Sequence, residues 1–509
     1  MKLNSSDSPI NYSPEAVQPQ MASVWWILFI SFIFLVLAHL VVKEFFPNPA
    51  IWVIGSMSIF AIGVVWLLIK KDYFAFLLVL FVCVHFSFAD AQGGLWSYVA
   101  LSIFLAVALL RNRISIEFSS VSISATFFLL IFLMHQVFGL LLNQYSLISN
   151  IQAIIVTFSQ VIIFYYCASQ SMSEANIKRL LSVWFAVICW VSLMAFNQKY
   201  HWVITSSPLL PQRYRSLYDG YISGFDTIPA GSFQNSELFG EYFCFVFVIA
   251  LIIAMHSTEF SRLRIKSVFP VITILLSLSL LVASASRSAV LLAIASAICL
   301  FITISVLVPS FRSLVKVSVL LMILSFSGLL LWRYGDVVGM DEMLKDFKEL
   351  NPAKITTESI ASGKGINRSF TGAYHLLSKK SWLLGHGYNL PENNTQSLGL
   401  RKGASDYHSL YICMPFFYGW GGSIAFVLFI IATGVRIFRS YFKSKGRSSA
   451  LVPLSLGFSV IWCVFLLDQY KISVTRNPSY FLLIWILLGL THALANTMQK
   501  DNHKLKGLN

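Results

Sequence analysis

The chain has 509 residues, of which 57% are hydrophobic and 12% are charged, and its mean hydropathy is +0.73. Soluble domains usually have roughly 25% charged residues, so a soluble globular protein of this length is excluded, as are disordered, collagen-like and disulfide-scaffold chains. A net charge of +15 would suggest nucleic acid binding in a soluble protein, whereas in a membrane protein it more often reports basic cytoplasmic loops. We therefore predict a helical membrane protein with several spans and no nucleic acid partner.

Apolar stretches that are long enough to cross a bilayer recur along the chain. A helix needs about 20 mainly apolar residues to cross a hydrocarbon core of ~30 Å, whereas β-barrel strands would alternate polar and apolar residues. The predicted spans are 24–42, 51–69, 73–89, 95–110, 124–142, 151–168, 179–196, 238–256, 268–284, 288–308, 315–332, 410–438, 450–467 and 478–496. The third and fourth are short, so the prediction is an all-α polytopic membrane protein with about 14 (12–14) transmembrane helices.

The lysines and arginines indicate which connections face the cytoplasm. With a cytoplasmic N-terminus, 20 of the 37 fall in cytoplasmic connections and 4 in short outer connections, and the remaining 13 lie in two long loops. Because cytoplasmic loops carry the excess of positive charge, both termini are predicted to be cytoplasmic. The apolar run that follows the polar N-terminus lacks a small-residue cleavage site, which indicates a membrane anchor and not a signal peptide.

The predicted topology divides the chain into seven segments. They are a disordered cytoplasmic N-terminus (1–23), an N-terminal transmembrane bundle (24–196), a first extracytoplasmic loop (197–237), central transmembrane helices (238–332), a large extracytoplasmic loop (333–409), C-terminal transmembrane helices (410–496) and a cytoplasmic tail (497–509). Loops as long as these two are usually functional. The large loop is predicted to contain short helices, near 340–350 and after Arg368. These helices would lie on the bilayer surface or pack against the ends of the spans.

The cysteines do not indicate a metal site. All seven lie inside apolar segments or at their edges, without metal-ligand spacing or a disulfide framework. We interpret them as small buried apolar residues. No metal and no cofactor are predicted.

Basic residues on the outer side are the candidates for chemistry. Arg213 and Arg215 lie in the first long loop, and Arg287 ends the sequence SASR between two spans, where small residues permit close helix approach. His408 lies at the entry to a later span. Guanidinium groups bind a diphosphate through paired hydrogen bonds and a permanent charge, and histidine accepts protons near neutral pH. The set predicts a site that binds a diphosphate and removes a proton.

Each of these residues also has a purely structural interpretation. Arg287 can extend its charge from a helix end to the membrane surface, Arg213 and Arg215 can be ordinary loop charge, and His408 can cap a helix. Other polar residues lie within apolar spans and are interpreted as interhelical hydrogen-bond partners: His85, His135, Gln136 and Gln160.

The layout resembles the superfamily of O-antigen ligases and O-antigen polymerases, which are multi-span proteins of the bacterial envelope with a large external loop late in the chain. The ligase branch carries a histidine, then Asn, Ser or Gln, nine residues, a glycine, two residues, and a small residue or Tyr. His408, Ser409, Gly419 and Gly422 fit this pattern throughout. The resemblance in motifs covers about residues 200–435, and the rest of the chain matches in hydropathy.

Two more motifs are similar to those of the superfamily. Arg213 and Leu217 fit an Arg-x3-Leu pattern of the ligase branch, and the sequence around Arg287 is similar to a serine–arginine segment of the family. Arg213 and Gly224 also fit an Arg-x10-Gly pattern of the polymerase branch, but the later loop has no second copy. The missing copy favours ligation, whereas about 14 spans favour polymerisation.

The resemblance implies an enzyme at the periplasmic face of the bacterial inner membrane, among membrane lipids. The donor would be a glycan on undecaprenyl diphosphate, and the acceptor a sugar hydroxyl on lipid A-core for a ligase or on a growing glycan for a polymerase. Arg213, Arg215 and Arg287 would bind the diphosphate without a metal, and His408 would remove the acceptor proton with inversion at the anomeric carbon. Leu217, Ser409, Gly419 and Gly422 would support these motifs.

Three alternatives to a lipid A-core ligase stay open: a repeat-unit polymerase, a ligase that attaches glycans to protein side chains, and a lipid-linked oligosaccharide flippase or other transporter. A late loop of about 77 residues with a histidine at its end is unusual for a flippase or transporter. Many transporters have an internal repeat that relates the two halves of the chain, and the span pattern here shows none.

Overall fold

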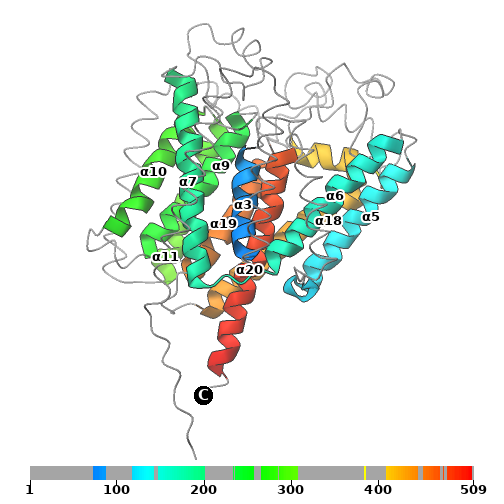
Figure 1. Cartoon of the computed structure of the whole chain (residues 1–509). Helices are drawn as coiled ribbons and strands as arrows, with labels where there is room; N and C mark the ends of the chain where they lie inside the picture. Colours follow the sequence, from blue (N-terminus) through cyan, green and yellow to red (C-terminus); the bar gives the residue numbers. More distant parts are fainter. Residues whose placement is uncertain are drawn as a thin grey trace, which may run out of the picture. The chain divides into compact units, whose positions relative to one another are not determined.

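The structure is a computed structural model, and it describes residues 73–86, 117–142, 147–200, 233, 236–256, 265–284, 286–307, 383–385, 409–444, 451–470, 474 and 478–506. By contacts the chain divides into two units, Met1–Ile62 and Gly63–Asn509, and all of the described residues belong to the second. Every regular element in the described part is a helix (Figure 1). The predicted all-α class is therefore confirmed for the residues that the structure describes.

The described elements are ten α-helices, each of which overlaps a predicted apolar span, and one 3-10 turn, which lies outside the predicted spans. They are α3 (Tyr73–Phe86), the 3-10 turn η3 (Phe118–Ser120), α5 (Ile123–Leu142), α6 (Leu147–Ala168), α7 (Glu174–Tyr200), α9 (Ser236–His256), α10 (Ile265–Ala283), α11 (Arg287–Leu307), α18 (Leu410–Ser444), α19 (Leu451–Asp468) and α20 (Pro478–Lys506). Four predicted spans lie outside the described residues: 24–42, 51–69, 95–110 and 315–332.

Five helices of the described part are long and apolar enough to cross a membrane, by length and composition. These segments are Glu174–Leu193, Ser236–Met255, Phe417–Ser444, Leu451–Asp468 and Tyr480–Lys500. Shorter apolar helices occur at Ile123–Gly139, Val156–Ala168, Phe269–Ala283 and Ser288–Leu300. The helices thus support a membrane protein, while the prediction of about 14 spans and a large external loop stays a prediction.

Helix α9 lies at the centre of one group of helices. Its residues are buried almost throughout, and it packs against α10, α11 and α19. A helix that is apolar on all sides must be surrounded by other helices or by lipid, and the neighbours of α9 satisfy that need. In the second group, α18 packs against α5, α19 and α20, and α20 also packs against α3 and α6 (Figure 1).

An aromatic cluster joins four helices. The Trp485 ring of α20 stacks on Phe429 of α18, with ring centroids 5.8 Å apart and an interplanar angle of 29°. Phe426 of α18, Phe164 of α6 and Phe132 of α5 surround the same indole, with centroid distances of 6.1, 6.0 and 6.5 Å. Aromatic pairs contribute about 0.5–1.5 kcal/mol each beyond the burial of area. Trp485 therefore helps to hold α5, α6 and α18 on α20.

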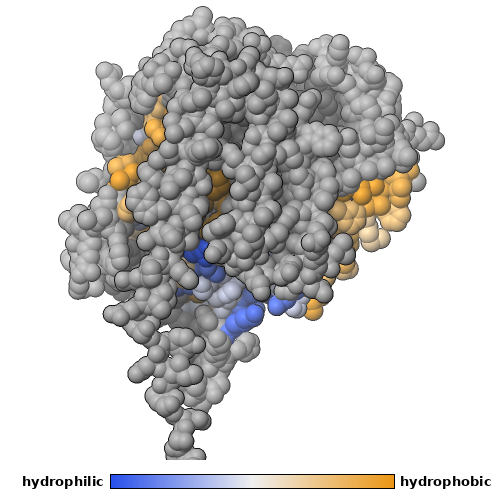
Figure 2. All heavy atoms as spheres, in the orientation of Figure 1, coloured by the Kyte–Doolittle hydropathy of each residue, from blue (hydrophilic) through white to orange (hydrophobic). Residues whose placement is uncertain are grey.

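Helix α5 has an exposed apolar face. Phe127, Leu130, Met134 and Phe138 follow one another at helical spacing, and 47–57% of the surface of each is exposed. Figure 2 shows apolar surface in the region where Figure 1 places α5. Such a stripe would favour aggregation of a soluble monomer, whereas in a membrane protein the lipid chains cover it.

At one end of the helices, Arg436 of α18 joins three segments. Its guanidinium donates hydrogen bonds to the Ser120 carbonyl oxygen (2.9 Å), to His492 Nδ1 (2.7 Å) and to the Asn496 side-chain oxygen. Because guanidinium only donates, His492 Nδ1 must accept, so the imidazole is neutral and its Nε2–H donates to Thr433 Oγ1 (3.1 Å). The Arg436 cluster thus connects η3, α18 and α20 at the end predicted to be cytoplasmic.

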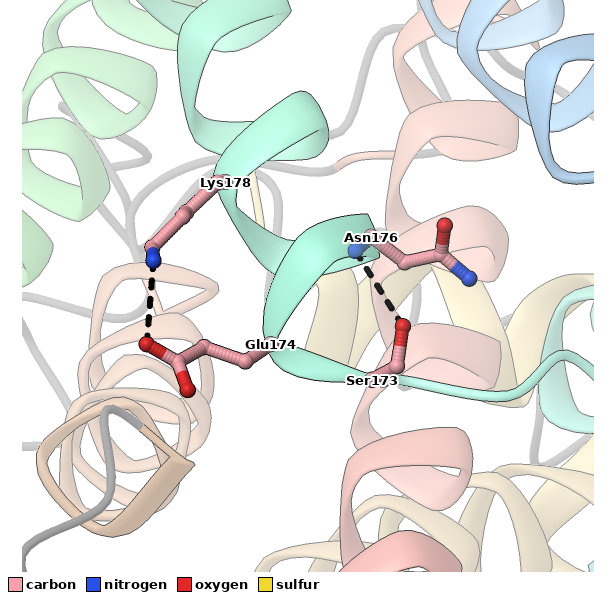
Figure 3. Close-up of polar contacts among 4 residues, drawn as sticks. All are labelled: Ser173, Glu174, Asn176 and Lys178. Carbon is pink, nitrogen blue, oxygen red and sulfur yellow. Dashed lines mark hydrogen bonds and ion pairs between the residues drawn. The ribbon is translucent and has the colours of Figure 1, made fainter. Parts of the chain in front are cut away.

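The start of α7 is capped close to this end. Asn176 N–H donates to the Ser173 hydroxyl (3.3 Å), as an N-cap does, and Lys178 lies 3.0 Å from Glu174 (Figure 3). This ion pair is exposed and is worth only about 0.3–0.5 kcal/mol. Met172, just before the cap, donates its N–H to Thr497 Oγ1 of α20 (3.1 Å). The connection from α6 to α7 is therefore tied to α20.

Helix α18 is kinked at Gly419. This residue has φ 68° and ψ 174°, a conformation that is essentially restricted to glycine. The segment Leu383–Gly385 lies directly against the kink: a Cβ atom on Gly419 would overlap the Leu383 carbonyl oxygen, and one on Gly385 would lie 2.6 Å from the carbonyl carbon of Phe417. Two glycines therefore allow two backbones to touch.

We predict that Gly419→Ala destabilises the protein by about 1–3 kcal/mol from backbone strain alone, with a further loss from overlap with Leu383. The matched control is Gly434→Ala in the same helix. A Cβ atom at Gly434 would meet only Trp462 Cβ at 3.5 Å, and alanine is favoured over glycine inside helices by about 0.5–1 kcal/mol. Thermal unfolding of the two variants in detergent tests the difference, and equal melting temperatures would contradict the assigned kink.

Candidate functional site

The predicted site residues divide into those that the structure describes and those that it does not. Arg213, Arg215, Leu217 and His408 lie outside the described residues. The backbone of Arg287 is described, and this residue begins α11. Ser409, Gly419 and Gly422 are described fully. The surroundings of the start of α11 and the start of α18 can therefore be examined.

Ser409 fixes the start of α18 to the end of α19. Its carbonyl oxygen accepts the first hydrogen bond of the helix, from Cys413 N–H (2.9 Å). Its hydroxyl donates to the Gln469 carbonyl oxygen (3.3 Å), and the Leu410 N–H donates to the same oxygen (2.9 Å). Ser409 thus occupies an N-cap position, but its side chain bonds another segment instead of capping its own helix.

The side chain of Gln469 extends this connection to α9. Its Nε2 donates to Glu241 Oε2 (2.7 Å), and its Oε1 accepts from Val474 N–H (2.9 Å). The Tyr480 hydroxyl donates to the other Glu241 oxygen, Oε1 (2.9 Å). Glu241, Gln469 and Tyr480 are all 0% exposed. We call these three side chains the Glu241 network; it joins α9, the end of α19 and the start of α20.

Glu241 is an unusual residue for its position. It lies one turn into a helix whose sequence continues as YFCFVFVIALIIAM, and the carboxyl of Asp468 is within hydrogen-bonding reach. Leaving a buried carboxyl without partners would cost several kcal/mol, and ionisable residues within apolar spans are often functional. Both carboxyl oxygens of Glu241 have neutral donors, so the network is satisfied without a cation.

The residue before Glu241 touches the segment that carries Arg287. A Cβ atom on Gly240 would lie 2.7 Å from Ser286 Cβ, 3.1 Å from Ala289 Cβ and 3.1 Å from Ser284 Oγ. Ser284 Oγ in turn accepts from Ser286 N–H (3.2 Å), which shapes the turn between α10 and α11. The small residues around Arg287 therefore do permit close helix approach, and α9 is the helix that approaches.

The second turn of α9 thus supports two predicted parts of the site at once. Gly240 lies against the start of α11, and Glu241 reaches the segment that holds Ser409. The starts of α9, α11, α18 and α20 and the end of α19 all meet here, and the sequence predicts that each of them faces the outer side. Among the residues that the structure describes, no group of three or more His, Cys, Asp or Glu side chains is arranged to hold a metal ion.

The two glycines of the histidine motif have structural roles. Gly419 forms the kink described above, and a Cβ atom on Gly422 would lie 2.9 Å from His135 Cβ and 3.0 Å from Tyr418 Cβ. The adjacent Gly421 touches the His135 ring itself. The motif spacing therefore places a kink and then a flat surface on which α5 packs, ten to thirteen residues after Ser409.

Gln136 makes the hydrogen bond between helices that the sequence predicts. Its amide in α5 donates to the Thr157 hydroxyl in α6. His85 and His135 instead hydrogen-bond to carbonyl oxygens one turn earlier in their own helices, Phe81 (2.6 Å) and Ile131 (2.9 Å). The His85 ring also packs on Tyr242 with centroids 5.2 Å apart, next to the Glu241 network.

Sequence analysis missed the Glu241 network. An acidic residue within a predicted span is a signal that would have indicated Glu241. Gln469 and Tyr480 have no comparable signal, because they lie 228 and 239 residues away from Glu241 along the chain and belong to no recognisable motif.

Comparison of the chain with protein-family models and with curated proteins finds no match. The functional interpretation therefore depends on the motifs of the chain and on the geometry of its helices.

We predict that Gly240→Ala disturbs the site more than Gly457→Ala, although each new Cβ atom would lie 2.7 Å from its nearest neighbour. At Gly240 that neighbour is the rigid Cβ of Ser286, so α9 and α11 must move apart. At Gly457 it is the flexible end of Ile249, which can rotate away. Gly240→Ala should therefore lose about 1–3 kcal/mol as an overpacked contact. Thermal unfolding in detergent measures this loss, and a smaller shift for Gly240→Ala than for Gly457→Ala would refute the assigned contact.

Proposed function

We propose that the protein transfers a glycan from undecaprenyl diphosphate to an acceptor sugar hydroxyl at the periplasmic face of a bacterial inner membrane, as an O-antigen ligase-like enzyme that acts on lipid A-core. One observation carries the proposal. The second turn of α9 contacts the start of α11, where Arg287 lies, and is connected through Gln469 to Ser409, which follows His408. Two motifs that are separated by about 120 residues in the sequence therefore share one support.

The proposed reaction uses a base and three cations. The acceptor hydroxyl attacks the anomeric carbon of the donor sugar, its proton passes to His408, and the bond from the sugar to the diphosphate oxygen breaks with inversion. Negative charge then accumulates on the leaving diphosphate. Arg213, Arg215 and Arg287 stabilise that charge in a site that is partly shielded from water, where charge stabilisation has its largest effect.

The proposed topology has about 14 spans, with both termini in the cytoplasm and residues 333–409 outside. It is supported by the bias of 20 lysines and arginines in cytoplasmic connections against 4 in short outer ones. It is also supported by the way the helix ends meet. Segments predicted to be outer meet at the Glu241 network, and segments predicted to be cytoplasmic meet at the Arg436 cluster.

The runner-up is a repeat-unit polymerase of the same superfamily. It uses the same donor and the same base, and it differs in the acceptor, which is the growing glycan. The predicted number of spans favours it. Reconstitution with a lipid-linked glycan separates these functions. Transfer to lipid A-core supports the ligase, chain elongation supports the polymerase, transfer to an added protein supports a protein-glycan ligase, and mere passage across the bilayer supports a flippase.

We predict that His408→Ala lowers the transfer rate by about 10²–10⁴, the usual contribution of a general base, without changing thermal stability. The measurement is the rate of glycan transfer by reconstituted protein. The matched control is His135→Ala, because His135 packs at the contact of α5 with α18 and bonds within its own helix. Full activity of His408→Ala would sink the proposal that His408 is the base.

We also predict that Arg287→Lys lowers transfer at least tenfold, because lysine keeps the charge but loses the paired hydrogen bonds of guanidinium. Arg439→Lys is the control, since Arg439 is exposed on α18 toward the end predicted to be cytoplasmic. Both variants are measured in the same transfer assay. Wild-type rates for Arg287→Lys would mean that a point charge is sufficient at this position.

A further inference from the structure

We propose that Gln469 is a positioning residue for the transfer reaction: through Glu241 and Val474 it fixes the carbonyl oxygen that holds Ser409 and Leu410, and so fixes the chain next to His408. The inference rests on the proposed function for its catalytic consequence. Its structural part stands on the described residues alone.

Gln469 holds the start of α18 through its backbone. Its carbonyl oxygen accepts two hydrogen bonds, from the Ser409 hydroxyl (3.3 Å) and from the Leu410 N–H (2.9 Å). Ser409 is the residue directly after His408, and successive Cα atoms lie about 3.8 Å apart. A displacement of the Gln469 carbonyl is therefore transmitted to within one residue of the proposed base.

The side chain of Gln469 determines where that carbonyl lies. Gln469 follows the last residue of α19, and its own N–H bonds back to Phe465 (3.0 Å). Beyond this turn its position is fixed by two side-chain hydrogen bonds, to Glu241 Oε2 (2.7 Å) and from Val474 N–H (2.9 Å). Both partners lie outside α19, so the amide of Gln469 locks the end of that helix to its neighbours.

Glu241 is well suited to be the fixed point of this arrangement. It lies in α9, which is buried along most of its length, and its second oxygen accepts from the Tyr480 hydroxyl (2.9 Å). A carboxyl whose two oxygens both have donors has a restricted rotation. The preceding residue, Gly240, touches Ser286, so the same turn of α9 also supports the start of α11.

The first test compares Gln469→Ala with Gln136→Ala. Both remove a buried glutamine whose amide donates to another helix, but Gln136 bonds Thr157 between α5 and α6. Gln469→Ala should lower kcat by about 10–100-fold, with KM for the lipid-linked donor changed less than threefold, because the base is displaced while the donor contacts remain. Gln136→Ala should retain kcat. An unchanged kcat in Gln469→Ala, or an equal loss in Gln136→Ala, overturns the inference.

The second test is rescue by exchange of the two side chains. In Glu241→Gln/Gln469→Glu, the amide at 241 donates to the carboxyl at 469, which still accepts from Val474 N–H, and the amide oxygen at 241 still accepts from Tyr480. Every hydrogen bond of the network is thus kept with one donor direction reversed. The kcat of the double variant should be at least tenfold higher than the kcat of the single variant Gln469→Glu. A double variant no more active than the single variant overturns the role of this pair.

The third test is independent of glycan transfer. Amide hydrogen exchange of the peptide that contains Leu410 should become at least tenfold faster in Gln469→Ala than in the wild type or in Gln136→Ala, because the acceptor of this N–H is no longer fixed. Unchanged exchange overturns the inference even if activity falls. If exchange accelerates as expected but the wild type shows no transfer to any acceptor, the proposed function fails while the anchoring role of Gln469 stands.

Discussion

The hydrogen-bonded carboxyl of Glu241 is the constraint on which the arrangement of the helix ends around it depends. A carboxyl inside an apolar helix is tolerated only if its oxygens find donors, since a buried polar group without partners costs about 1–3 kcal/mol and a charged one more. Gln469 and Tyr480 supply those donors from the end of α19 and the start of α20. Any movement that separates α9 from either segment would leave a carboxyl oxygen without its donor and would incur that penalty. The carboxyl therefore favours one packing of the three helices.

The opposite end uses the inverse arrangement. There the charged group is a half-buried cation, Arg436, and its partners are neutral acceptors on Ser120, His492 and Asn496. At each end neutral groups thus hydrogen-bond an ionisable side chain and join segments that are distant in the sequence, and at the Glu241 end a second buried acid, Asp468, lies within reach. Purely apolar helices slide and rotate against one another at little cost, because lipid is as apolar as leucine. One polar cluster at each end sets their register.

The sequence predicts the helices well because their signal is local. Apolar stretches of about 20 residues give the bounds of α5, α9 and α11 within a few residues. It does not predict the Glu241 network, because donors more than 220 residues away leave no pattern within any one span. The kink of α18 is hidden for a different reason. Gly419 lies in an apolar run that also reads as one continuous helix, and only its φ of 68° interrupts it.

The geometry also separates the structural members of the histidine motif from the chemical one. Ser409 bonds the end of α19, Gly419 makes the kink, and Gly422 receives α5. Each of these residue types is required by packing: a hydroxyl donor at a helix start, a backbone conformation restricted to glycine, and a surface without a Cβ atom. Among the residues of the motif, His408 is therefore the one for which we propose a chemical role. A sequence that matched the spacing but lacked the histidine would be predicted to share the helix geometry and not the reaction.

The direction of the Glu241 carboxyl argues for support and against a direct part in catalysis. A leaving diphosphate is strongly negative, and a carboxylate a few ångströms from it would oppose its departure, by about 4 kcal/mol for two unit charges at 4 Å near a protein surface. Both oxygens of Glu241 face Gln469 and Tyr480, and the group is 0% exposed. The acid is thus kept away from an incoming anion, while Gly240 beside it packs against the start of α11 and Gln469 connects it to Ser409.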